Sequence, residues 1–367
     1  MKNRLALFAA LTIPSGPADI SINNFNLVES IRTQRSLELI AKQAHIYREE
    51  ERSLLEEIQG KIWSAQSAIY SLKANSAIVD TKSQNFITNG ETQIGTPDQY
   101  LFETVNVSYL TQERILQSTE KVTLSPQKDL SIGQSKFYLE GIGLKLSLEE
   151  DLFEIMSSVT AKELNTKNGM TIHSNSFRYN TLGSSIDFIG KANVNHPNYT
   201  MDGHALKIDF FESNSNGSQQ LKQLFMTREK SKQLRTKIDS TLFRSDGFKI
   251  MFKTDGSIEE SRAIGAAEAV LEDGIVLKAE TLTSRIDEGV SKIFLDEKVE
   301  IQTPKRSAFC ESAVFTPETG EFTLFNVASL SEANQTISGE KIIFSTKDSY
   351  IQVEKAKGKL QKESLSP

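Results

Sequence analysis

Few residues of this chain have the types and spacing that catalysis or metal binding requires. The four histidines, His45, His173, His196 and His204, do not have the spacing of metal ligands with one another or with a cysteine. The single cysteine, Cys310, excludes an internal disulfide and occupies a small-residue position of the repeat described below. A buried structural thiol is therefore the favoured interpretation of Cys310, rather than a reactive one. We expect no metal site, no catalytic residue and no cofactor.

Other motifs that could take part in catalysis or ligand binding also fit ordinary structural roles. Gly141–Ile142–Gly143 is a fragment of a phosphate-binding loop, but no strand-to-helix context follows it. The acidic groups 49–51 and 149–151 fall in turn-like positions, where charged side chains are normally solvated. A carbohydrate-active enzyme needs paired carboxylates beside aromatic platforms, and Trp63 is the only tryptophan in the chain. The sequence favours a binding or scaffolding protein.

The strongest pattern is a repeat of apolar and small residues. Between Met170 and Phe210, apolar residues alternate with polar ones over short runs that end in Asn, Gly, Pro or Ser, which is typical of half-buried antiparallel strands. The alternation slips by one residue after each small residue, as a β-bulge or a sharp bend would require. The small residues recur at intervals of 28 to 42 positions, and they are Ala41, Ala74, Thr104, Gly141, Ser174, Gly203, Ser245, Ala279, Cys310 and Ser338.

A period near 30 residues predicts stacked β-units that share one continuous core. Residues 46–62 are rich in Glu and Leu, a composition that favours a helix. Copies of the repeat flank them on both sides, so we expect a hairpin with a charged turn instead. The predicted fold class is all-β. The length of the chain and its 38% hydrophobic content predict two domains, over residues 19–166 and 167–361, followed by a disordered tail at 362–367.

Charge and the amino terminus restrict the partners and the location. The net charge of −6 without a basic stripe argues against nucleic acid. Lys2 and Arg4 precede the apolar run Leu5–Ile13, and small residues follow up to Ala18. Residues 1–18 therefore resemble a secretory signal or a trimmed anchor. The run is too short to span a bilayer, which needs about 20 residues. Export from the cytoplasm is expected.

The first half of the chain resembles LptC, the bitopic component of lipopolysaccharide export. The resemblance is carried, in this order, by ISINNFNLVES, FITNGETQI, YLFETVNVSYLTQERILQSTEKVTL and LEGIGLKLSLEEDLFEIMSSVTAKE. The second half is similar to LptA and related OstA-like domains through MTIHSNSFRYNTLGSSIDFIGKANV and through the segment from FKIMFKTDG to FLDEKVEI. LptC proteins usually carry a membrane-spanning amino-terminal helix, for which the run Leu5–Ile13 is too short.

The resemblance implies open, V-shaped β-jellyroll modules with an apolar inner groove. It implies a non-enzymatic, periplasmic protein that shields the acyl chains of lipopolysaccharide or a similar multi-acyl lipid within a bridge between the two membranes. Implied partners are other Lpt proteins or a second copy, bound by edge-strand addition, and an inner-membrane ABC transporter, so inner-membrane association is also expected. The groove is predicted to be lined by Phe102, Tyr109, Ile172, Phe177, Tyr179, Phe188, Met201, Leu206, Ile208, Phe243, Phe248, Ile250, Leu277, Leu282 and Phe315.

Two alternatives remain from the residues alone. Any one of these apolar side chains could simply fill a closed core. The chain could also be a β-solenoid surface, adhesion or scaffold protein that binds partners on its exterior, although the Asn or Gly ladders usual in such proteins are missing.

Overall fold

The structure is a computed structural model that describes residues 14, 16–31, 34–97, 99–127, 136–164, 169–180, 185–211, 220–229, 232–287, 289–333, 335–348 and 350–358. The chain divides into two compact units, Met1–Phe188 and Ile189–Pro367. The predicted boundary at 166/167 lies inside the first unit, because two strands that follow it pair with the strand that precedes it. Most of the signal-like segment and the whole predicted disordered tail lie outside the described residues.

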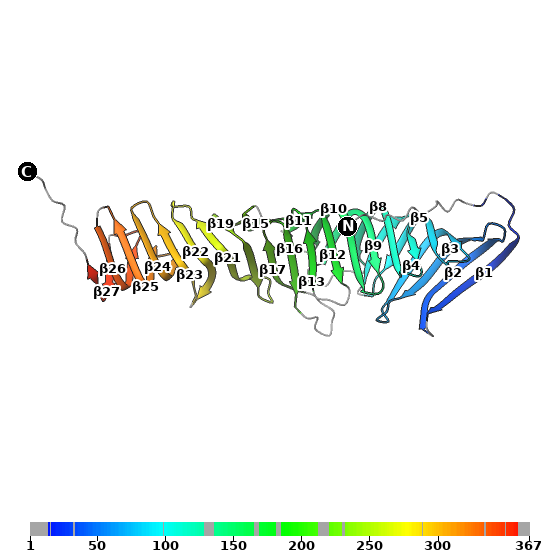
Figure 1. Ribbon diagram of the computed structural model, residues 1–367, viewed down its shortest axis with the longest axis horizontal. Coiled ribbons are helices and arrows are strands. Elements are labelled where there is room, and N and C mark those ends of the chain that lie inside the picture. The colour runs from blue at the N-terminus through cyan, green and yellow to red at the C-terminus, as the bar shows by residue number, and fades with distance from the viewer. Residues whose placement is uncertain are drawn as a thin grey trace, which may run out of the picture. The chain divides into compact units, whose positions relative to one another are not determined.

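The described residues of the first unit form thirteen strands, which are coloured from blue to green in Figure 1. They are β1 (Ile20–Ile31), β2 (Gln34–Tyr47), β3 (Arg52–Trp63), β4 (Ile69–Asp80), β5 (Phe86–Gly95), β6 (Tyr100–Val105), β7 (Ser108–Leu110), β8 (Ile115–Pro126), β9 (Lys136–Ser147), β10 (Leu152–Leu164), β11 (Thr171–Ser174), β12 (Ser176–Asn180) and β13 (Ser185–Ile189).

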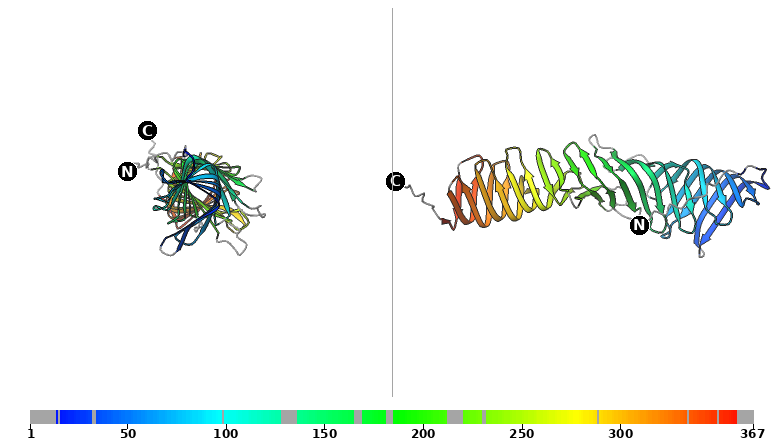
Figure 2. Two further views of the ribbon diagram at one scale, coloured as in Figure 1. Left: turned by 90° about the vertical axis from the view of Figure 1, so that its right-hand side faces the viewer. Right: turned by 45° about the horizontal axis from the view of Figure 1, so that its top comes forward.

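The second unit continues in the same manner, and its yellow to red strands lie side by side in chain order in the right-hand view of Figure 2. They are β14 (Asn193–His196), β15 (Tyr199–Asp202), β16 (Ala205–Phe210), β17 (Leu221–Thr227), β18 (Leu234–Ile238), β19 (Thr241–Ser245), β20 (Gly247–Phe252), β21 (Ile258–Val270), β22 (Val276–Asp287), β23 (Val290–Gln302), β24 (Arg306–Thr316), β25 (Glu321–Glu332), β26 (Gln335–Ser345), β27 (Ile351–Glu354) and β28 (Lys357–Gly358).

The all-β prediction is confirmed, and the described residues contain no helix. Residues 46–62 form the end of β2, a turn and most of β3, so the predicted hairpin is also confirmed. Ser53 and Leu55 alternate inward along β3, whereas Glu51 in the turn has a positive φ of 56°. Strand pairing on both sides of β3 thus overrides its helix propensity.

Most long strands bend near their middle. In β21–β25 the pairing register shifts at one place in each strand, between Ile264 and Ala267 in β21 and between Lys278 and Thr281 in β22, with equivalent shifts in the next three strands. Glycine occupies some of these bends at positive φ, as at Gly143 and Gly265, because an L side chain adopts that conformation only with strain. The sequence predicted these bends from the slips in alternation.

Because the bends line up from strand to strand, the halves of the strands pair separately, and the continuous hydrogen-bonded sheet is folded into two layers in each unit, which we call sheets. In the first unit, β11 pairs with the second half of β10, whereas β12 pairs with the first half. In the second unit, β19 and β20 divide β21 in the same way.

We name the sheets by these halves. Sheet 1A holds 25–31, 34–41, 58–63, 69–74, 91–95, 100–105, 121–126, 136–142, 159–164 and 171–174, and sheet 1B holds 20–23, 43–47, 52–56, 76–80, 86–89, 108–110, 115–118, 144–147, 152–157, 176–180 and 185–188. Sheet 2A holds 193–196, 199–202, 234–238, 241–245, 267–270, 276–278, 299–302, 306–309, 328–332, 335–339 and 357–358, and sheet 2B holds 205–210, 221–227, 247–252, 258–264, 281–287, 290–296, 312–316, 321–325, 341–345 and 351–354.

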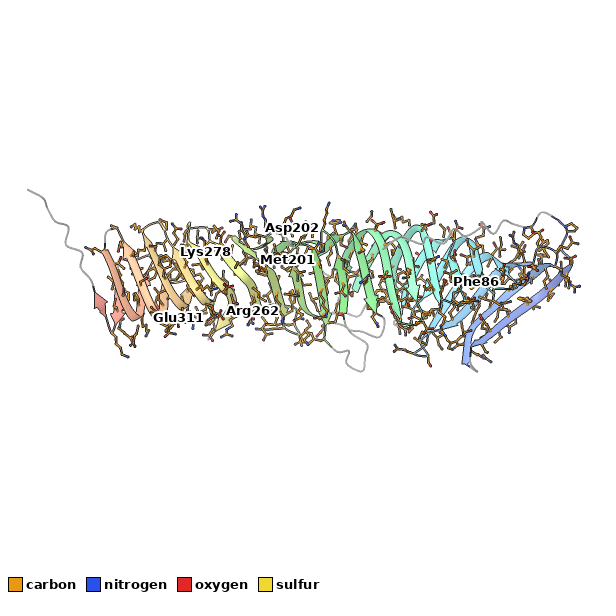
Figure 3. The ribbon with its side chains drawn as sticks, in the orientation of Figure 1. Phe86, Met201, Asp202, Arg262, Lys278 and Glu311 are labelled. Atoms are coloured by element: carbon orange, nitrogen blue, oxygen red, sulfur yellow. The ribbon has the colours of Figure 1, made fainter. Side chains whose placement is uncertain are left out.

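The core of each unit lies between its two sheets. Inward and outward side chains alternate along each strand, as at buried Met201 and exposed Asp202 of β15, both labelled in Figure 3. Along the bends of the first unit the interior is lined by hydroxyl groups instead. Thr88 Oγ1 lies 2.7 Å from Thr92 Oγ1, and the Ser118 hydroxyl donates to the Val105 carbonyl at 2.8 Å. These groups replace strand hydrogen bonds that the bend interrupts.

Candidate functional site

All fifteen residues predicted to line a groove point into the interior of their unit, and their exposed fractions are 0 to 6%. Sheet 1A contributes Phe102 and Ile172, and sheet 1B contributes Tyr109, Phe177, Tyr179 and Phe188. The second unit places the others on both of its sheets, with Met201, Phe243 and Leu277 on sheet 2A and Leu206, Ile208, Phe248, Ile250, Leu282 and Phe315 on sheet 2B. Their burial is thus a finding, and their role in binding lipid stays a prediction.

Aromatic contacts join the two sheets of the first unit. Phe102 of sheet 1A stacks on Phe153 of sheet 1B with ring centroids 4.3 Å apart, and Tyr70 meets Phe153 edge-on at 5.8 Å. Further along, Tyr100 and Tyr179 approach to 6.5 Å across the same interior. Only Phe102 and Tyr179 of these residues were predicted from the sequence. Phe153 and Tyr70 have the same inward parity on their strands, which is the signal that could have identified them.

Polar contacts close the first unit along the line where strand ends of sheet 1A meet strand ends of sheet 1B, opposite the bends. We call this line the seam. The Tyr70 hydroxyl donates to Asp151 Oδ1 at 2.6 Å. The Ala65 amide donates to the Leu148 carbonyl at 2.9 Å, and Arg114 Nη2 donates to the Trp63 carbonyl at 2.6 Å.

Asp151 corrects one expectation. The sequence placed residues 149–151 in a solvated turn, yet Asp151 is completely buried. Its backbone has a positive φ of 51°, and its side chain is in hydrogen-bond contact with Tyr70 inside the seam. Its second oxygen, Oδ2, has no hydrogen-bond partner among the described residues. A carboxyl group is costly to bury, and no local sequence pattern announces such a site.

A second cluster of polar side chains, which contains Glu29, Tyr109, Arg114 and Glu149, lies near this seam. Arg114 Nε lies 3.0 Å from Glu149 Oε1. Burial raises the pKa of Glu29 above its ordinary value, and the positive charge of Arg114 offsets this shift only in part. Burial, helped by the charge of Glu29, raises the pKa of Tyr109 to about 12. The Tyr109 hydroxyl finds no hydrogen-bond partner within the described part of the chain. These groups lie in an environment of low polarity although they are polar themselves.

Contacts between described residues also close a seam in the second unit. Tyr199 of sheet 2A and Phe252 of sheet 2B lie 6.4 Å apart. Farther along the chain, Arg306 Nη1 donates to the Ser345 carbonyl at 2.9 Å, and the Arg306 guanidinium lies 5.9 Å from the centre of the Phe344 ring.

A pocket of about 290 Å³ opens in this second unit. Sheet 2A and its turns line one side, whereas sheet 2B and its turns line the other, so the pocket leads from the surface to the space between the sheets. Two predicted groove residues, Phe243 and Phe315, are part of its wall. Sequence reasoning missed the other lining residues, which are Ile238, Asp239, Ser240, Thr241, Ser261, Leu271, Glu272, Asp273, Ile275, Ser284, Ser291, Ile293 and Pro317.

The motifs that could have supported other chemistry have structural positions. Gly141–Gly143 lies within strand β9, and Cys310 is buried, which raises the pKa of its thiol to about 12. Within the described ranges, no group of three or more His, Cys, Asp and Glu residues could hold a metal ion. The described chain also contains no helix of the length and apolar character needed to cross a membrane.

Comparison with known families gives one match. Residues 15–164, which contain β1–β10, match the family model described as "Lipopolysaccharide-assembly, LptC-related". The first unit up to β10 is therefore similar to LptC-related proteins, as the sequence motifs indicated. A search of curated proteins gives no match. The similarity of the second half to LptA stays a prediction.

Proposed function

We propose that this protein carries lipopolysaccharide, or a similar lipid with several acyl chains, by shielding those chains between the two sheets of its units. The observation that carries the proposal is the apolar interior of bent antiparallel strands in a chain whose residues 15–164 match a lipopolysaccharide-assembly family. The protein acts without catalysis, in the periplasm or at the inner membrane, as part of a bridge between the membranes.

The physical need for such a shield is large. Each methylene exposed to water costs about 0.8 kcal/mol, so one chain of a dozen carbons costs on the order of 10 kcal/mol. A strip of inward apolar side chains that continues from strand to strand offers hydrocarbon a path away from water. The inward side chains pack against one another, so acyl chains enter by separating the sheets. Polar contacts at the seam, such as Tyr70–Asp151, are weaker obstacles to this opening than the continuous hydrogen-bonded ladders of the sheets.

Strand β1 supports a role in a bridge. It pairs with β2 along one side, and its inward residues Ile20, Ile22, Phe25 and Leu27 are only half-buried. β1 and β2 form the blue end of the unit in Figure 1. A strand edge with a half-covered apolar face fits docking of another Lpt module, of a second copy, or of a β-domain on an ABC transporter, by edge-strand addition.

Photo-crosslinking in cells tests the proposal. A photoreactive residue replaces Phe177, Phe188 or Phe248 in the interior, and the control position is Arg178, which faces outward and pairs with Glu154 at 2.7 Å. Crosslinks to lipopolysaccharide from the three interior positions and not from the control support an interior lipid path. An exported, folded chain that gives no lipid crosslinks from the interior contradicts it.

Binding of partners on the exterior is the second candidate. A groove of about 440 Å³ lies on the outer side of sheet 1A, with Ile40, Gln59, Lys61 and Lys73 among its lining residues. Ile40 is half-exposed there. Protein crosslinks from a photoreactive residue at Ile40, together with no lipid from the interior positions, favour this alternative.

A further inference from the structure

We infer that the pocket in the second unit is a lateral portal through which a single acyl chain of a lipid enters the space between sheets 2A and 2B. This inference rests on the proposed function, and it adds the place and the manner of entry. The pocket is a local opening, because the Tyr199–Phe252 contact and the Arg306–Ser345 hydrogen bond join the two sheets at other points of the same unit.

The walls of the portal suit hydrocarbon. Phe243 and Ile275 come from the side of sheet 2A, and Ile293 and Phe315 come from sheet 2B. These four side chains keep exposed fractions of 3 to 5%, whereas Leu295, the next inward residue after Ile293, is fully buried. The pocket therefore has apolar walls, and Leu295 lies in the next layer of side chains behind them. An acyl chain that fills this space would displace water from an apolar surface.

An isoleucine at the rim marks the same opening. Ile286 of β22 lies opposite Ser291 of β23, which lines the pocket. Ile286 shares the inward parity of Leu282 and Ser284, yet 64% of its surface is exposed. Ile286 lies one residue before the end of β22, and the opposite sheet does not cover it there. In this proposal, Ile286 offers a first contact for an acyl chain beside the pocket.

The lip of the pocket is acidic, in contrast to its apolar walls. Asp239, Glu272 and Asp273 of the turns beside sheet 2A are exposed and line the entrance. Hydrated carboxylates at the entrance disfavour burial of an anionic head group, because like charges repel and dehydration is costly. The head group therefore stays outside while the tail enters. The volume of about 290 Å³ lies at the lower end of the range for small-ligand pockets, which fits one chain rather than a whole multi-acyl lipid.

Among the described residues of the first unit, three hydrogen bonds cross the seam. There Tyr70, Ala65 and Arg114 hydrogen-bond across the seam to Asp151, Leu148 and Trp63. The difference predicts that a free fatty acyl chain enters the second unit before it enters the first.

The test uses the full chain and two probes, cis-parinaric acid and purified lipopolysaccharide. Parinaric acid fluoresces when its chain leaves water. In the variant Ser291→Trp a large side chain at the exposed lip obstructs the portal, whereas Ser329→Trp places the same side chain on the outer side of sheet 2A as a matched control. We expect at least a fivefold weaker affinity for parinaric acid in Ser291→Trp and no change in Ser329→Trp. Equal affinities in the two variants overturn the portal.

A crosslinking arm separates the portal from the proposed function. Photoreactive residues at Ile286 and Ser291 report on the portal, and one at Phe248 reports on the interior. Lipopolysaccharide crosslinks at all three positions support both inferences. Crosslinks at Phe248 alone support the proposed function and overturn the portal. The absence of crosslinks at all three positions overturns both. Circular dichroism of each variant confirms that the β-structure is retained, and Ser284→Leu, which fills the pocket from within sheet 2B, provides a second obstruction if Ser291→Trp does not fold.

Discussion

The hydroxyl of Tyr70 donates a hydrogen bond to the buried carboxyl of Asp151 at 2.6 Å, although 81 positions separate the two residues in the chain. Tyr70 is the second residue of β4, in its sheet 1A half, and Asp151 ends the turn before β10 enters sheet 1B. The contact therefore joins the two sheets of the first unit where their strand ends meet. Beside it, Tyr70 and Phe102 both pack on Phe153, so polar and aromatic contacts close the seam together.

The substitution Tyr70→Phe removes the hydroxyl and retains the ring. Because Asp151 is fully buried, the loss of its donor leaves the carboxyl without this hydrogen bond, and an unsatisfied buried polar group costs about 1–3 kcal/mol. We expect the urea midpoint of unfolding to fall accordingly. The double variant Tyr70→Phe with Asp151→Asn is the control, because a direct interaction makes the two effects non-additive. Additive effects would show that the two side chains act independently.

Locking the seam tests whether the first unit must open to take up lipid. The Ala65 amide and the Leu148 carbonyl are hydrogen-bonded, so their Cα atoms lie within reach of a disulfide. In a Cys310→Ser background, the pair Ala65→Cys and Leu148→Cys is expected to abolish lipopolysaccharide crosslinking at Phe102 when oxidised and to restore it when reduced.

The matched control for the lock is a disulfide inside one sheet. Lys61 and Ser71 lie directly opposite each other in the β3–β4 ladder of sheet 1A, and a bridge between them does not cross the seam. We expect Lys61→Cys with Ser71→Cys to load lipid equally in both redox states. If the Ala65–Leu148 lock also loads normally when oxidised, lipid reaches Phe102 without separation of the sheets.

Alkaline pH is expected to destabilise the protein through two buried groups. Burial raises the pKa of Cys310 from an ordinary 9.0, and that of Tyr109 from an ordinary 10.0, to about 12 in each case. Between pH 9 and pH 12 the unfolded chain releases these protons while the folded chain keeps them, so stability falls as pH rises. Below pH 9 both groups are neutral in both states and their stabilising contribution is complete.

The measurement for this prediction is the urea midpoint at several values between pH 8 and pH 11. Cys310→Ala should lower stability at pH 8 because it removes a buried side chain, whereas Tyr109→Phe should not, because the hydroxyl that it removes has no hydrogen-bond partner among the described residues. Each variant should give a flatter decline above pH 9 than the parent. A parent and variants with identical slopes would mean that neither group titrates differently in the folded and unfolded chains.

The bends predict a position-specific cost of adding a methyl group. At Gly265, φ is +76° and a Cβ atom would lie 2.9 Å from the Cβ of Asp246. At Gly256, φ is +83° and no heavy atom lies within 4 Å of the added Cβ. Gly256→Ala should therefore cost only the backbone strain, about 1–2 kcal/mol, whereas Gly265→Ala should cost more. Thermal unfolding compares the two variants, and a larger loss at Gly256 would contradict the role of the bend.

The sequence by itself determined the elements and the inward faces. Alternation with period two fixes which side of a strand is buried, so all fifteen predicted groove residues could be placed in the interior without a structure. Slips in that alternation located the bends near Ala279 and Cys310, where the register shifts. Residues 46–62 were identified as a hairpin because repeat copies lie on both sides. These features depend on near neighbours in the chain, and a sequence records near neighbours directly.

Only the tertiary structure decided how the sheets meet. Whether a turn is solvated depends on what the opposite sheet places over it, so residues 149–151 look like a surface turn until Tyr70 is brought to Asp151. The pocket in the second unit has the same origin, because its lining residues, such as Phe243 and Phe315, come from strands and turns of both sheets that are far apart in the chain. Contacts between strand ends far apart in the chain follow from the bend and twist of whole sheets, which no local spacing encodes.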